Sequence, residues 1–153
     1  MPNPTFDTHT AHRWFAVELN NNLWRALEAG RWSADDAEQN IHAAHASCYH
    51  WLEVGNISHH ARAECLVANV YAVAGLGESA LRHARRCQEL LEDSPYAFED
   101  WDFAFAYDAL ARAYGLTGDV GEAEHSLQQA RTAGDAIVDE EDRAIFQRWF
   151  ARR

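Results

Sequence analysis

The chain has 153 residues and a formal net charge of −11, and its thirteen basic residues are all arginine. A chain this acidic is poorly suited to nucleic acid, because phosphate affinity comes from clustered Lys and Arg. The absence of lysine also excludes a Schiff-base lysine and a phosphate-loop lysine.

We expect neither a membrane span nor a targeting signal. No run reaches the roughly 18 apolar residues of a membrane span. Residues 1–5 have no positive charge and no apolar stretch, which predicts no signal peptide and a cytoplasmic location. Three cysteines, Cys48, Cys65 and Cys87, lie far apart within helical apolar patterns. We expect buried, reduced thiols, with a reactive thiol as the alternative.

Apolar periodicity and capping signals predict a chain made of helices. Gly30 closes the first helix, Ser33 caps the second, and Asn56 or Ser58 caps the third. Asp93-Ser94-Pro95 is the clearest break, because proline disfavours helix in the residue before it. The expected helices cover residues 9–29, 34–54, 57–75, 78–92, 96 or 98–116, 120–134 and 140–151.

A repeated spacing predicts how these helices pair. Small or apolar residues recur at steps of four and then three: Ala37, Ile41 and Ala44; Ala80, Ala84 and Cys87; Ala123, Leu127 and Ala130. Small residues at these intervals let two antiparallel helices approach closely, and a glycine before the later sets ends the preceding helix. We therefore predict one all-α domain, residues 1–153, of three stacked antiparallel helical hairpins. The hairpins span approximately 9–55, 57–93 and 96–134, and a C-terminal capping helix covers approximately 139–151.

The last hairpin carries Tyr107, Leu110, Ala111, Tyr114, Gly118, Ala123, Leu127 and Ala130. These positions resemble the signature of the tetratricopeptide repeat (TPR). The middle hairpin matches less fully, and its Tyr71 lies 43 residues before Tyr114, beyond the ~34 of a regular array. Residues 44–51, 70–73, 83–84 and 102–107 look like a group of small bacterial TPR-like proteins with no generally assigned reaction or ligand. The resemblance implies a TPR-like superhelix.

In a TPR-like hairpin the first helix lines the concave groove. Carried over to this chain, the groove residues are Arg62, Cys65, Asn69, Phe105, Asp108 and Arg112. An arginine, an asparagine and an aromatic suit a peptide, a partner protein or a small anionic ligand. An ion pair within the helix is the alternative for Asp108 and Arg112, which are four residues apart.

A metal site or small enzyme is the runner-up function. Glu38, His42 and His45 share one face of a helix and offer nitrogen and oxygen donors. Glu122 and His125 form a single Glu-x-x-His pair, whereas carboxylate-bridged metal bundles use two. Glu99 and Asp102 have no evident apolar enclosure, which favours a solvated helix face over catalysis. We predict no cofactor and no catalytic residue.

Six tryptophans are many for a chain of this size. Trp14, Trp24 and Trp32 lie in the first hairpin, and Trp149 lies in the last helix. These residues are expected to form core that caps the two ends. A homo-oligomer or partner contact through the aromatic ends is the alternative.

Overall fold

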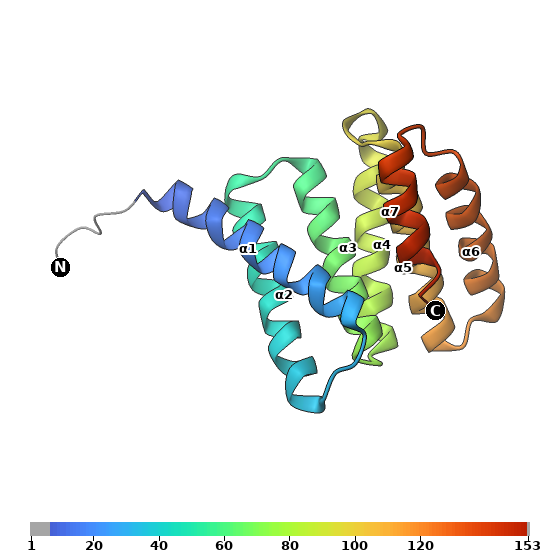
Figure 1. Cartoon of the computed structure of the whole chain (residues 1–153), viewed down its shortest axis with the longest axis horizontal. Coiled ribbons are helices and arrows are strands. Elements are labelled where there is room, and N and C mark those ends of the chain that lie inside the picture. Colours follow the sequence, from blue (N-terminus) through green and yellow to red (C-terminus); the bar gives the residue numbers. More distant parts are fainter. Residues whose placement is uncertain (1–6, 153) are drawn as a thin grey trace.

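The computed structural model describes residues 7–152, which hold seven α-helices, one short 3-10 helix and no strand (Figure 1). The α-helices are α1 (Thr8–Ala29), α2 (Ala34–Val54), α3 (Ile57–Val73), α4 (Gly77–Asp93), α5 (Asp100–Thr117), α6 (Val120–Asp135) and α7 (Glu140–Phe150). The 3-10 helix η1 covers Pro95–Ala97. The all-α class expected from the sequence is confirmed.

Local capping chemistry sets most of the helix boundaries. The Ser33 hydroxyl accepts from the backbone N–H of Asp36, whose carboxylate accepts from the backbone N–H of Ser33. Such a capping box satisfies two N–H groups that would otherwise lack partners at the start of α2. At Gly30, Gly75 and Gly118 the backbone has φ of 69°, 77° and 81°. Because side chains rarely tolerate this left-handed conformation, glycine ends these helices as the sequence predicts.

The fifth helix starts later than expected. Pro95–Ala97 forms η1, and α5 begins at Asp100 rather than at residue 96 or 98. The cause is local, since the backbone N–H of Glu99 donates to the Asp102 carboxylate at 3.0 Å. That hydrogen bond places Glu99 at the N-cap position of α5.

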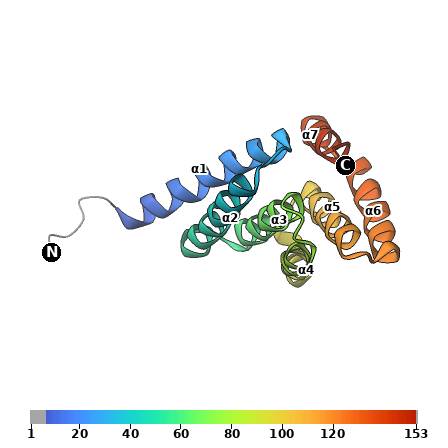
Figure 2. The same ribbon diagram turned by 90° about the horizontal axis from the view of Figure 1, so that it is seen from below.

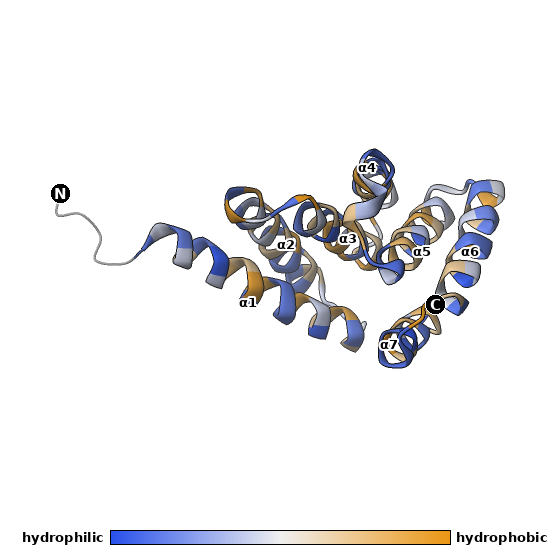
Figure 3. Cartoon of the chain, turned by 90° about the horizontal axis from the view of Figure 1, so that it is seen from above, coloured by the Kyte–Doolittle hydropathy of each residue, from blue (hydrophilic) through white to orange (hydrophobic). Residues whose placement is uncertain are grey.

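Helices α3 and α5 lie at the centre of the fold and contribute the largest sets of buried residues. Each helix from α1 to α6 packs against the next along the chain, and α3 also packs against α5. Figures 2 and 3 show α1 and α7 on one side of α3 and α5, with α4 on the other. In Figure 3, α5 carries mostly apolar residues and α6 mostly polar ones. In the described part of the chain, no helix is both long and apolar enough to cross a bilayer.

The last helix returns to the first. Trp149 of α7 is buried together with residues of α1, α2 and α3. Its ring meets the ring of Trp24 in α1 edge-to-face, with centroids 5.2 Å apart. The Arg152 guanidinium donates to the backbone carbonyl of Glu28, at the end of α1. As a result α1 and α7 form two walls that converge above α3 and α5.

One tryptophan does not follow the expectation of a capping core. Trp14 is 58% exposed, and its neighbour Phe15 is 44% exposed. The first turns of α1 extend past the ends of their neighbours in Figure 2, although Phe15 still stacks on His50 of α2 with ring centroids 5.4 Å apart. Trp24, Trp32 and Trp149 do pack into the cluster around α1, α2 and α3.

Candidate functional site

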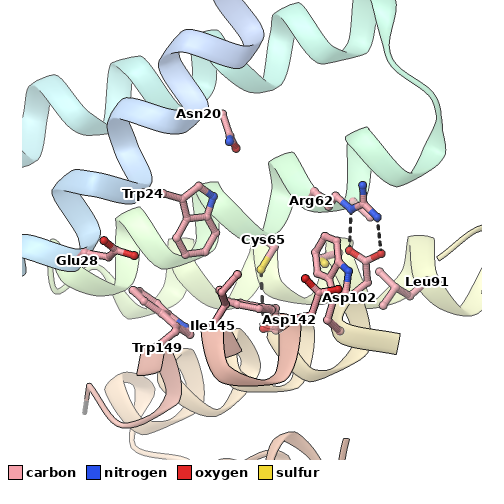
Figure 4. Close-up of a pocket in the computed structure, with 14 residues that line it drawn as sticks. Asn20, Trp24, Glu28, Arg62, Cys65, Leu91, Asp102, Asp142, Ile145 and Trp149 are labelled. Carbon is pink, nitrogen blue, oxygen red and sulfur yellow. Dashed lines mark hydrogen bonds and ion pairs between the residues drawn. The ribbon is translucent and has the colours of Figure 1, made fainter. Parts of the chain in front are cut away.

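A cavity of about 400 Å³ lies where α1 and α7 face α3 and α5 (Figure 4). The wall residues are Asn20, Trp24 and Glu28 from α1, and Asp142, Ile145 and Trp149 from α7. The floor residues are Ala61, Arg62 and Cys65 from α3, and Trp101, Asp102 and Phe105 from α5. Cys87 and Leu91 of α4 complete the lining. Within each helix these positions are one, three, four, seven or eight residues apart, so they share one face.

Four aromatic rings in series form the apolar part of the lining. Trp101 and Phe105 have centroids 6.2 Å apart, and Phe105 and Trp24 have centroids 5.9 Å apart. Trp24 continues to Trp149, and all three contacts are edge-to-face. Perpendicular rings point their faces in different directions. A group inside the cavity therefore meets aromatic surface from more than one side.

Arg62 supplies the positive charge of the lining but is already paired. Its guanidinium donates two hydrogen bonds of 2.8 Å to the carboxylate of Asp102. The same guanidinium lies 4.4 Å from the centroid of Trp101. The hydrogen bond with Asp102 raises the pKa of Arg62 above its ordinary value, against an opposing effect of burial. The positive charge of Arg62 is thereby neutralised by the carboxylate of Asp102.

Asp102 is a correction to the sequence expectation. Its side chain is only 4% exposed, whereas a solvated helix face was expected there. A buried carboxylate is tolerated when it is paired and hydrogen-bonded, and the fork of Arg62 does both. Asp102 acts here as the counter-ion of Arg62.

The expected groove residues divide into two groups. Arg62, Cys65 and Phe105 line the cavity, whereas Asn69, Asp108 and Arg112 do not. Asn69 is 1% exposed and donates to the carbonyl of Cys65 at 3.0 Å. Its amide oxygen is buried and has no hydrogen-bond partner among residues 7–152. Asn69 is therefore enclosed within α3 and its neighbours, where a ligand in the cavity does not meet it.

Asp108 and Arg112 hold the α7 wall in place. Arg112 donates to Asp108 at 2.7 Å, the ion pair within one helix that the sequence left open. Arg112 also donates to the backbone carbonyls of Trp149 and Arg152, and it lies over the Trp149 ring. The pair is thus engaged in fastening α7 to α5.

The cavity carries an excess of negative charge. The lining holds one guanidinium, that of Arg62, and three carboxylates, those of Glu28, Asp102 and Asp142. Asp102 is neutralised by Arg62. The side chains of Glu28 and Asp142 have neither a hydrogen bond nor an ion pair within the described residues. Two unpaired carboxylates therefore border an aromatic cavity.

The histidines proposed as metal ligands lie elsewhere. His45 is outside the cavity lining and forms a 2.8 Å hydrogen bond with the hydroxyl of Tyr71. Burial lowers the pKa of His45, and the nearby His83 lowers it further. Across residues 7–152, no group of three or more His, Cys, Asp or Glu side chains is placed to hold a metal ion. The Glu38, His42 and His45 alternative gains no support from this geometry.

Sequence reasoning missed the two walls of the cavity. Trp24, Glu28, Asp142 and Trp149 all line it, although none was among the expected groove residues. A weak signal was present, because Asn20, Trp24 and Glu28 are spaced four residues apart and therefore share one face of the helix. The missing information was that α7 faces this stripe.

Comparisons of this chain with protein families, curated proteins and solved structures give no indication of its function. No protein-family model matches this chain, and neither curated proteins nor solved structures give a significant match.

Proposed function

We propose that the chain is a binding protein, built as a TPR-like stack of helical hairpins, that holds a small molecule between α1 and α7. The observation that carries the proposal is the cavity of about 400 Å³ with four aromatic rings in its lining. Small-molecule sites are concave, mostly apolar, and typically about 300–1,000 Å³ in volume, with a few placed polar groups. The cavity has each of these properties.

The anionic ligand expected from the sequence is disfavoured. Arg62, Asn69 and Arg112 were the expected donors. Asn69 is enclosed, and each arginine is paired with a buried aspartate. An anion that recruited either guanidinium would leave Asp102 or Asp108 buried without its counter-ion. Leaving a buried charge uncompensated typically costs about 3–5 kcal/mol. Binding of a long peptide is also less favoured, because α7 covers the side of the molecule where the cavity lies.

The proposal is tested by blocking the cavity. Asn20→Trp places a large ring at the α1 wall, whereas Asn21→Trp adds the same ring on the exposed face of α1. A library of small fragments is screened against nitrogen-15-labelled protein by following the indole N–H resonances. Binders should shift the resonances of Trp24, Trp101 and Trp149, and Asn20→Trp should abolish those shifts while Asn21→Trp preserves them.

Native and denaturing mass spectra of the purified protein complete the test. A molecule that copurifies with the parent and the Asn21→Trp control, but not with Asn20→Trp, would support the proposal. Fragment binding that persists in Asn20→Trp, or that shifts only the exposed Trp14, would contradict it.

A further inference from the structure

We infer that the ligand of this cavity is a small organic cation, such as an alkylated ammonium compound. The inference rests on the proposed function, because it names the ligand class for the same cavity. Three observations support it: the two carboxylates that lack a partner among the described residues, the two lining rings that have no guanidinium over them, and the charge of the whole chain.

The unpaired carboxylates give the cavity its preference for positive charge. Glu28 extends from α1 and Asp142 from α7, so the two opposite walls each contribute one. Figure 4 shows Glu28 beside Trp24 and Trp149, on the far side of the lining from Arg62. A cation seated against the Trp24 ring would approach the Glu28 carboxylate on the side of the cavity away from Arg62, whereas the Trp149 ring already has Arg112 over it.

The rings supply a second attraction for a cation. Trp, Tyr and Phe faces attract cations within about 6 Å of the ring centroid, and tryptophan attracts them best. The protein already uses two rings of the lining in this way, with Arg62 over Trp101 and Arg112 over Trp149. No guanidinium lies over Trp24 or Phe105 in the described part of the chain. Both rings line the cavity, so a bound cation would meet them without competition from a guanidinium of the described residues.

The size of the cavity and the net charge of the protein agree with such a ligand. A weakly hydrated alkylammonium group has the apolar surface that an aromatic lining requires, whereas a metal ion does not. The net charge of −11 creates a field that attracts cations and repels anions. Salt screens this attraction, so the affinity for a cation should fall as ionic strength rises.

The test compares three molecules of nearly equal shape and different charge. Choline is the cation, 3,3-dimethylbutan-1-ol is its neutral isostere, and 3,3-dimethylbutanoate is the anion. Binding is measured from the indole resonances of nitrogen-15-labelled protein and by calorimetry. We expect choline to bind about tenfold or more tightly than the alcohol, and the anion to bind most weakly.

Charge-neutralising variants locate the effect. Glu28→Gln and Asp142→Asn together should weaken choline binding about tenfold and leave binding of the alcohol within about twofold. Glu18→Gln on α1 and Glu141→Gln on α7 are the matched controls, because neither residue lines this cavity. Glu141→Gln also reproduces the loss of one acidic residue from the first turn of α7.

The outcomes separate this inference from the proposed function. The cation inference is overturned if the alcohol or the anion binds as tightly as choline. It is also overturned if the double substitution of Glu28 and Asp142 leaves choline binding unchanged. The same holds if choline fails to bind while fragments still occupy the cavity in a manner that Asn20→Trp abolishes. If no fragment depends on Asn20, the proposed function is overturned, and the cation inference with it.

Discussion

The indole nitrogen of Trp149 in α7 donates a hydrogen bond of 2.8 Å to the carboxylate of Asp108 in α5. The acceptor is fully buried, and it also accepts from Arg112. One carboxylate therefore satisfies a neutral donor from α7 and a charged donor from its own helix. This arrangement sets the position of the tryptophan that closes the cavity.

Asp108→Ala should lower the free energy of unfolding by about 3–5 kcal/mol, because it leaves the Arg112 charge without its counter-ion. Asp108→Asn should cost less, since its amide oxygen still accepts one hydrogen bond. Urea unfolding followed by circular dichroism measures both values. A loss below about 1 kcal/mol in Asp108→Ala would mean that the network contributes little to stability.

Gly134→Ala should destabilise the protein by about 1–3 kcal/mol, because a Cβ atom has no room at this position. It would lie 2.2 Å from Cε1 of Phe146, which is itself 1% exposed and enclosed. Gly115→Ala is the matched comparison, since a Cβ there meets nothing within 4 Å. That change should stabilise α5 by about 0.5–1 kcal/mol. Equal effects of the two substitutions would show that α7 can move away from α6.

Stability should decline as the pH falls below about 6.5, the ordinary histidine pKa. Burial is the first cause that lowers the pKa of His45, His50 and His59, with smaller contributions from nearby positive groups. Below about pH 6.5 the folded protein therefore binds fewer protons at these histidines than the unfolded chain does. The stability that the neutral histidines contribute is fully present above the unfolded pKa and is lost as the pH falls below it.

Urea midpoints at about pH 7.5 and pH 5.5 measure this decline. Replacing His45, His50 and His59 together by glutamine should flatten the dependence, whereas replacing the exposed His125 should not. Hydrogen bonding to threonine and serine lowers the pKa of Asp7 and Asp36, whose ordinary value is 3.8. Their contribution is lost only at lower pH, outside this window. An unchanged slope in the triple variant would assign the decline to other groups.

The thiols should alkylate slowly while the protein is folded. Burial raises the pKa of Cys48 to about 12, and Glu64 adds to the effect. The neighbouring Cys65 thiol and burial raise the pKa of Cys87 well above its ordinary value. Because the thiolate is the nucleophile, labelling by iodoacetamide at about pH 8 should be about a hundredfold slower than in urea. Peptide mass spectrometry resolves the sites, and rapid labelling of Cys48 or Cys87 in the native protein would contradict the prediction.

Local patterns in the sequence were sufficient to predict the helices. Ser33 and Asp36 satisfy each other over three residues, and Gly118 ends α5 through its own backbone conformation. Interactions of this kind depend on a few neighbouring side chains, so they leave a readable signature. The start of α5 was placed too early because Tyr96 and Phe98 extend the apolar pattern past the N-cap.

The cavity depends on interactions that local patterns do not record. Arg62 and Asp102 are 40 residues apart, and neither position alone reveals that the other neutralises it. From the sequence alone, Arg62 is interpreted as a free hydrogen-bond donor for an anion, and Asp102 is interpreted as a solvated carboxylate. Trp24 and Trp149 are further apart still, and only the return of α7 brings them together. The residues expected from hairpin geometry alone therefore included only part of the lining.

The contact between Arg152 and Glu28 connects the last helix to the first. A row of helices that touch only their neighbours can fray from either end without disturbing the middle. Here, loosening α1 or α7 removes a wall of the cavity, so both ends of the row must be in place before a ligand is enclosed. During synthesis the cavity forms only once α7 has left the ribosome. A molecule bound there would consequently hold the two ends of the fold together and strengthen the cooperativity of the whole chain.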